Sequence, residues 1–171
     1  MLTQEDNLLM QSFYSTMLLV ELKKSDFLNS SFFDNMVFDF PAMKGELKKI
    51  GVDNQGCALM SLYAMLVIPR QLFESQFTNE YQHIDAFLQR NTAKTVTTYK
   101  KDSPKIDFLR HVRNAVAHAH ISFRPSEAIC FSDENKTTGE TFSTELPLGQ
   151  LGEFFNELMQ VHISFVGKQS A

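Results

Sequence analysis

The sequence predicts an all-α fold, an antiparallel helical bundle with a small β-hairpin between its last two helices. Apolar residues recur with helical spacing in several long segments, and short β-prone runs gather in a single region near the end of the chain. A length of 171 residues fits one domain, which we expect to span residues 1–171. Hydrophobic residues make up 43% and charged residues 21% of the chain, which excludes a disordered or collagen-like protein.

The first third of the chain begins with a helix. Apolar residues repeat with a 3.6-residue period from Thr3 to about Lys24, which predicts an opening amphipathic helix. The segment 32–51 mixes aromatic residues with Pro41 and Gly51, so we expect only short helical turns there. The sequence does not indicate what residues 1–52 contribute to function.

The middle of the chain predicts two further helices and a loop. Residues 57–77 are apolar on nearly every side, as in the buried central helix of a bundle, and Pro69 is expected to kink or split it. Asn79 is a candidate cap for a helix that runs to Arg90. Residues 91–103 are polar and rich in Thr, which favours a linker or mobile loop.

The last third contains the helix that matters most for function. Ser103 is a candidate N-cap and Pro104 suits the first helical position, so a helix is predicted to begin there and continue over residues 105–120. Three β-prone runs follow, separated by turn formers, and predict the hairpin. The last helix is predicted over residues 148–167.

The charge of the chain is segregated. The net charge is −4, yet residues 90–124 contain eight basic and only two acidic residues. The protein as a whole would repel a polyanion, whereas this one segment is suited to hold phosphate. The alternative is that the segment is simply a solvated loop and helix face.

Other classes of protein lack support in the sequence. Cys57 and Cys130 belong to no CxxC pair, and no apolar run approaches the ~18 residues of a membrane span. The acidic start of the chain is unlike a secretory signal, so we expect a cytoplasmic protein. The spacing of His111, His118 and His120 is a weak metal pattern, and we expect neither a metal nor a cofactor.

The helix predicted over 105–120 separates apolar from polar residues. At ~100° per residue, Leu109, Val112, Val116 and Ala119 share an arc expected to enter the core. The opposite side gathers five polar residues: Asp107, Arg110, His111, Asn114 and His118. Arg113 lies at the border, ~140° from His118, so joining these two requires a long side chain, an unwound helix end or a second subunit.

Residues 113–118, RNAVAH, resemble the signature of the HEPN domain family, small α-helical proteins whose motif is Arg, a polar residue, several others and then His. The resemblance covers roughly residues 55–165. It implies a homodimer in which the two motif helices face each other and bring both Arg–His sets into one cleft. In one branch of the family a Tyr two positions after the His is modified by a partner nucleotidyltransferase; this chain has His120 there, and Arg113 to His120 also satisfies the loosest motif spacing.

These residue types suit metal-independent cleavage of RNA. RNA carries its own nucleophile, the 2′-hydroxyl, so a base and a cation suffice for the reaction. The expected catalytic residues are His118 as acid or base, Arg113 on the phosphate and Asn114 as an orienting group. Arg110, His111 and His120 are the expected substrate-binding residues. The expected function is a toxin or defence endoribonuclease with RNA as substrate and a nucleotidyltransferase-type antitoxin as a candidate partner.

Two other interpretations stay open at this stage. A non-catalytic HEPN-like dimer would bind RNA, a nucleotide or a protein partner in the same cleft, and a helical scaffold would use the basic segment only for solubility. A histidine at a helix end such as His118 is also favoured by the helix dipole alone, and Arg113 could pair with an acid elsewhere in the fold.

Overall fold

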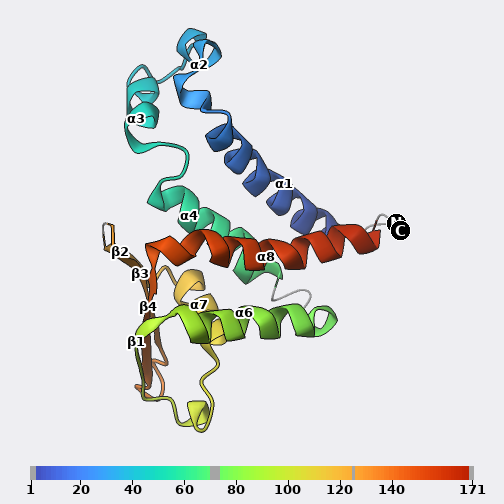
Figure 1. The fold of residues 1–171 in the computed structure, drawn as a ribbon, viewed down its shortest axis with the longest axis vertical. Helices are drawn as coiled ribbons and strands as arrows, with labels where there is room; N and C mark the ends of the chain where they lie inside the picture. The colour runs from blue at the N-terminus through green and yellow to red at the C-terminus, as the bar shows by residue number, and fades with distance from the viewer. Residues whose placement is uncertain (1–2, 70–73, 125, 170–171) are drawn as a thin grey trace.

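The protein is described by a computed structural model that covers residues 3–69, 74–124 and 126–169. Helices and a four-stranded antiparallel sheet make up the fold (Figure 1). The helices are α1 (Gln4–Lys24), α2 (Ser31–Asn35), α3 (Met43–Ile50), α4 (Gln55–Leu62), α6 (Thr78–Asn91), α7 (Phe108–Ala117) and α8 (Leu148–Gln169). The strands are β1 (Ala93–Thr97), β2 (Ile121–Arg124), β3 (Ala128–Glu134) and β4 (Thr141–Pro147).

The sheet has the order β1-β4-β3-β2 with every neighbouring pair antiparallel. The predicted hairpin region supplies β2, β3 and β4, and the three β-prone runs of the sequence are confirmed as strands. Phe131 and Phe142 are buried, whereas Ser132 and Ser143, which pair across β3 and β4, are exposed. Because side chains alternate along a strand, one face of the sheet packs on the core and the other faces solvent.

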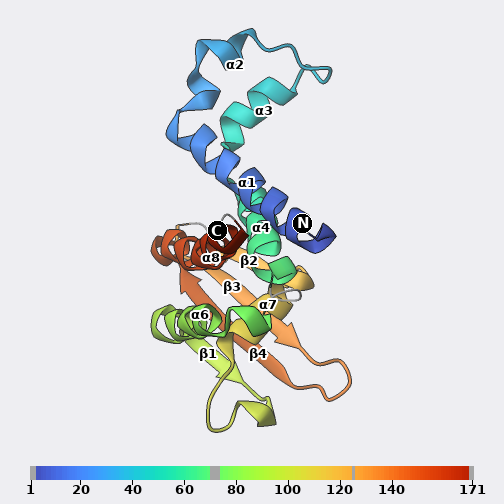
Figure 2. The ribbon, with the colours of Figure 1, turned by 90° about the vertical axis from the view of Figure 1, so that its right-hand side faces the viewer.

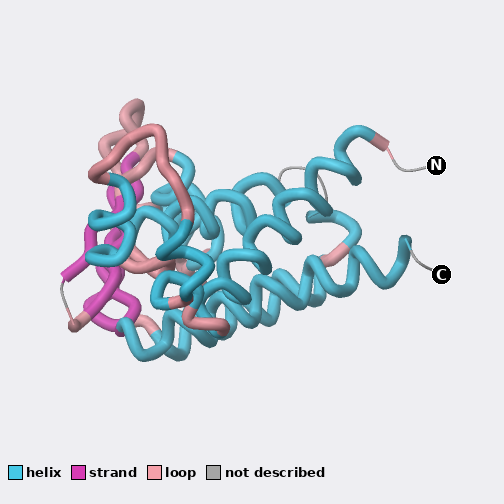
Figure 3. The backbone as a smooth tube through the Cα atoms, turned by 90° about the horizontal axis from the view of Figure 1, so that it is seen from above, coloured by secondary structure: helices cyan, strands magenta, loops and turns pink. Residues whose placement is uncertain are grey.

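Helices α6, α7 and α8 lie on the inner face of the sheet, and α6 runs beside α8 (Figures 1 and 2). The core between them is built from aliphatic and aromatic side chains, including Leu88, Val112, Phe131 and Phe154, all fully buried. A π-helical turn, Tyr63–Val67, continues α4 into this core. Seen from above, the sheet lies on one side of the molecule, and the first turn of α1 and the end of α8 lie on the opposite side (Figure 3).

Helices α1, α2 and α3 form an arm that extends away from the sheet (Figure 2). Helix α1 begins with a capping box in which Thr3 and Asp6 exchange hydrogen bonds between side chain and backbone, as the predicted start at Thr3 requires. The arm carries exposed Phe32, Val37 and Phe40. The short turns predicted for 32–51 are confirmed as α2 and α3.

The chain is mostly helical, as predicted, but the prediction of an all-α fold with only a small hairpin is wrong, because a four-stranded sheet is present beside the helices. The fourth strand is β1, which comes from the segment 91–103 that was expected to be a loop. This segment is rich in β-branched residues, and pairing with β4 orders it: Val96 lies opposite Ser143, and the Thr95 hydroxyl contacts that of Thr144 at 2.7 Å.

The predicted starts of two helices are also wrong. Helix α7 begins at Phe108 with Asp107 as its N-cap rather than at Pro104, and the Ser103–Pro104 peptide bond is cis. Helix α6 begins at Thr78, so Asn79 lies inside its first turn. The kink or split expected at Pro69 falls next to residues 70–73, which lie outside the described part of the chain. Among the described residues, no helix is long and apolar enough to cross a membrane.

Candidate functional site

Helix α7 carries most of the predicted site, and side chains at its first turn fix where it begins. The Asp107 carboxylate accepts the backbone N–H of Arg110 at 2.9 Å, and Asp85 of α6 accepts that of Leu109 at 3.0 Å. The helix ends at Ala117. His118 occupies the C-cap position and donates its backbone N–H to the Asn114 carbonyl at 3.0 Å.

A buried polar cluster surrounds His111 in the middle of α7. This His111 cluster comprises Tyr99, Asp102, Arg110, His111, Asn114 and Asp133. His111 itself is fully buried, and its ring stacks on Phe142 at a centroid distance of 4.2 Å. Its Nδ1 lies 2.6 Å from Oδ2 of Asp133, which also accepts the Asn114 side-chain amide at 3.0 Å.

The opposite edge of the His111 ring meets Asp102 and Arg110. Nε2 lies 3.0 Å from Asp102 Oδ2 and 2.8 Å from Arg110 Nη2. The Asp133 carboxylate oxygen is an acceptor, so Nδ1 is the donor to it. Nε2 then donates to Asp102 in the cationic ring or accepts from Arg110 in the neutral ring. Arg110 also donates to Asp102 at 2.9 Å. The cluster therefore ties α7 to the segment before it and to β3.

The pKa values within the cluster reflect this arrangement. Burial alone raises the pKa of Asp102, but hydrogen bonds from Thr97 and His111, together with the positive charges of His111 and Arg110, lower it below its normal value. Burial and the neighbouring Asp133 carboxylate raise the pKa of Tyr99 to about 12. The folded protein thus favours a charged Asp102 and a neutral Tyr99.

A second group of polar side chains is exposed where α7 passes into β2. The rings of His118 and His120 lie 6.0 Å apart between centroids, and both residues are exposed. The backbone N–H of Ser132 donates to the His120 carbonyl at 3.0 Å, so His120 continues β2 alongside β3. Ala119 between them adopts a positive φ of 55°, which turns the chain from the helix into the strand.

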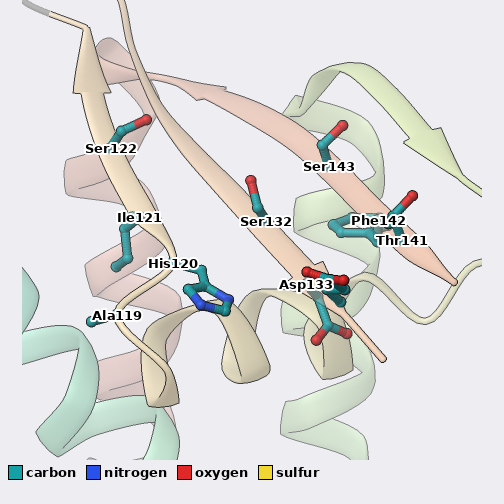
Figure 4. Close-up of a pocket in the computed structure, with 10 residues that line it drawn as sticks. Ala119, His120, Ile121, Ser122, Ser132, Asp133, Thr141, Phe142 and Ser143 are labelled. Carbon is teal, nitrogen blue, oxygen red and sulfur yellow. The ribbon is translucent and has the colours of Figure 1, made fainter. Parts of the chain in front are cut away.

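His120 lines a cavity of about 550 Å³ on the solvent-facing side of the sheet (Figure 4). Side chains of β2, β3 and β4 complete the lining, and the hydroxyls of Ser122, Ser132 and Ser143 project from the strands on the same side (Figure 4). Among the residues that line it are His120, Ser122, Ser132, Glu134, Thr141 and Ser143. The backbone segment of β3 that holds Asp133 thus separates this outer cavity from the buried His111 cluster.

The structure divides the predicted site residues between these two places. His111 was predicted to bind substrate from a polar face, but it is fully buried, so its ring has no surface for RNA. Arg110 is half-buried and turned toward Asp102. The Asn114 amide reaches Asp133, and among the described contacts it makes none with the His118 imidazole. Of the six predicted site residues, only His118 and His120 are exposed.

The positions of Arg113 and of the residues at the helix end also differ from those that an ideal helical wheel predicts. Arg113 is half-buried, whereas Ala119, expected in the core, is exposed beyond the helix end. The angle of ~140° between Arg113 and His118 assumes an ideal helix that includes both residues. His118 lies at the C-cap, where the helix has ended, so this angle does not give the direction of its side chain. No cluster of three or more His, Cys, Asp or Glu side chains that could hold a metal occurs among the residues described.

Comparison with known proteins adds one match. The family described as HEPN pEK499 p136 matches the chain over residues 3–169. The chain belongs to this HEPN family. No curated protein and no solved structure gives a significant match.

Membership in the HEPN family confirms the resemblance carried by residues 113–118 and extends it through the arm, since the match begins at residue 3. In this HEPN chain the motif occupies the second half of α7 and the turn that follows. Sequence reasoning missed Asp102, Asp133 and Tyr99 as partners of His111. One signal for Asp133 was present: it alternates with Ile129 and Phe131, which places a carboxylate on the buried face of a strand.

Proposed function

We propose that the protein is a metal-independent endoribonuclease of the toxin or defence type that acts as a homodimer. The proposal depends mainly on one observation: His118 is an exposed imidazole at the end of the motif helix, beside His120 and a polar cavity. The HEPN family is consistent with an RNase-like or nucleotide-binding function. A histidine in this position can exchange protons with a bound substrate near neutral pH.

The reaction uses the 2′-hydroxyl of RNA as the nucleophile. His118 removes its proton, the 2′-oxygen bonds to phosphorus, and the bond from phosphorus to the 5′-oxygen breaks as that oxygen takes up a proton from water. The products carry a 2′,3′-cyclic phosphate and a 5′-hydroxyl. The Arg113 guanidinium stabilises the negative charge on the phosphoryl oxygens.

Roles for the remaining motif residues follow from their contacts. Asn114 is held by Asp133, and its carbonyl accepts the His118 N–H, so we assign it to positioning the helix end. His120 contacts substrate from the strand side. His111 and Arg110 act through the buried cluster that holds α7 against β3, and not through direct contact with RNA.

A second protomer completes the site in this proposal. Arg113 is half-buried and His118 is exposed beyond the helix end, so a two-fold contact between motif helices supplies the Arg113 of one chain to the His118 of the other. A nucleotidyltransferase-type antitoxin and a cytoplasmic location belong to the same proposal.

The decisive experiment measures cleavage of a mixed RNA pool by chelator-treated protein. Arg113→Ala and His118→Ala are each expected to lower cleavage at least about 100-fold, the lower range for loss of acid–base catalysis. Matched controls are Arg90→Ala and His83→Ala, because both residues are exposed on α6 and belong to neither group.

Three results are informative. Full activity in the Arg113 or His118 variant would exclude that residue from catalysis, and a stable monomer with full activity would exclude the shared site. RNA that is bound but not shortened by the wild type would support the non-catalytic HEPN-like dimer instead.

A further inference from the structure

The cavity beside His120 has a lining that disfavours phosphate. Its charged lining residues are Asp133 and Glu134, and no Lys or Arg lines it among the described residues. Asp133 is buried and already accepts hydrogen bonds from His111 and Asn114. Glu134 is exposed and has no cationic partner within the described part of the chain, so its carboxylate is available to a ligand. A phosphate there would meet negative charge without compensation.

The same lining suits a flat polar ligand with hydrogen-bond donors. The volume of about 550 Å³ lies within the ~300–1,000 Å³ range of ligand pockets. The serine hydroxyls both donate and accept, and the His120 imidazole offers a flat face for stacking. Single-stranded RNA is read by such combinations, in which a base stacks on an aromatic ring and its edge is hydrogen-bonded.

We propose that this cavity binds a guanine base of the RNA, with the Glu134 carboxylate accepting from N1–H and the N2 amino group while His120 packs on the ring. This inference rests on the proposed function in taking RNA as the ligand. Guanine is favoured because it presents two adjacent donors that match the two oxygens of a carboxylate. Uracil presents one donor between two carbonyl oxygens, which a carboxylate repels.

The position of the cavity relates it to the proposed reaction. The His118 ring lies 6.0 Å from that of His120, so a base held in the cavity places its own sugar–phosphate link next to the proposed catalytic imidazole. In this arrangement Arg113 binds the phosphate, and the residues of the sheet bind the base. In protein–nucleic acid recognition generally, phosphate contacts position the chain and base contacts give specificity.

The test measures binding of mononucleotides to the wild-type protein by NMR of the histidine ring protons, with His120→Gln identifying the His120 signals. Guanosine 5′-monophosphate is expected to shift the His120 signals and to bind at least about tenfold more tightly than uridine 5′-monophosphate. Ribose 5-phosphate, which has the phosphate but no base, is expected to leave those signals unchanged.

Two variants sharpen the measurement. Glu134→Gln is expected to weaken guanosine monophosphate binding about tenfold or more but not to weaken uridine monophosphate binding, because the amide no longer repels the uracil carbonyl oxygens. Ser132→Ile is expected to abolish binding of both by filling the cavity. Glu153→Gln is the matched control, because Glu153 is an exposed carboxylate on α8 outside the cavity. Thermal melting of each variant checks that the fold is retained.

The outcomes separate this inference from the proposed function. Equal binding of the two nucleotides, unshifted His120 signals or an unaffected Glu134→Gln variant would overturn the guanine site even if the protein cleaves RNA. Selective binding of guanosine monophosphate without any cleavage would uphold the site while refuting the endoribonuclease.

Discussion

Replacing Asp133 by Ala tests whether the His111 cluster holds α7 against the sheet. The carboxylate is 5% exposed and accepts two hydrogen bonds, from His111 Nδ1 at 2.6 Å and from Asn114 Nδ2 at 3.0 Å. The Asp133→Ala variant removes both bonds and leaves the His111 donor buried without its partner. The cluster then contains Arg110 and a single carboxylate, Asp102, on the far side of the ring.

The expected loss of stability follows from these contacts. A hydrogen bond to a charged group contributes about 1.5–3 kcal/mol, and an orphaned buried donor costs about 1–3 kcal/mol. Breaking a buried pair on one side typically costs about 3–5 kcal/mol, which we adopt because the two previous figures partly count the same effect. A domain of this kind has about 5–15 kcal/mol in total, so the variant loses a large share of its stability.

Urea unfolding followed by circular dichroism measures this free energy. With a slope of about 2 kcal/mol per molar, the midpoint of Asp133→Ala is expected to fall by roughly 2 M. Glu134→Ala is the control, because it removes the adjacent but exposed carboxylate and is expected to change stability by less than about 0.5 kcal/mol. If Asp133→Ala loses less than about 1 kcal/mol, the cluster does not hold the helix and our account of His111 is wrong.

Three other predictions follow from single residues. Burial lowers the pKa of His162, so the unfolded chain takes up this proton more readily than the folded chain as pH falls below about 6.5, and stability should drop from pH 7 to 5. His162→Phe, which can still stack on Phe13, should reduce the accompanying drop in melting temperature. Tyr99, with its pKa raised to about 12, stays neutral in the folded protein at a pH where an unfolded tyrosine ionises, near 10. Stability should therefore fall above pH 10, and an ultraviolet titration of Tyr99→Phe should lack the ionisation step that the wild type shows near 12. Asp107→Ala removes the N-cap of α7 and should cost about 1 kcal/mol in urea unfolding, whereas an unchanged midpoint would show that the cap is dispensable.

The helices were predictable because their apolar periodicity reflects a single buried face. Helix α1 has the predicted Thr3 as its N-cap and ends at the predicted Lys24, and α8 begins at the predicted Leu148. Strand β1 was not predictable in this way, since a short Thr-rich segment is ordered only through pairing with β4, almost 50 residues later in the chain. Such a partner leaves no local signal, and tertiary context decides the outcome.

The candidate site was predicted less well because an ideal helical wheel places His111 on the polar, solvent-facing side of the helix. The buried arc of α7 is wider than expected, and it admits His111 because Asp102 and Asp133 supply partners for both ring nitrogens. Asp133 lies 22 residues beyond His111 on another element, so spacing along the helix cannot show that pair. The exposed pair His118 and His120 was within reach of the sequence, since both residues lie at the predicted helix end.

The pairing of charges in the fold also changes what the basic segment 90–124 can do. Arg110 pairs with the buried Asp102, and Arg124 pairs with Glu127 and Glu145. Lys94 and Lys105 contact Glu145 and Asp85, but both lysines are largely exposed, and such surface pairs are weak enough to exchange for phosphate. The formal charge of the segment therefore overstates its attraction for RNA, since two of its arginines are committed to the fold. The other six basic residues of the segment remain for a polyanion, and the proposed dimer would bring two such sets to one site, which would strengthen its attraction for the phosphates of the proposed RNA substrate.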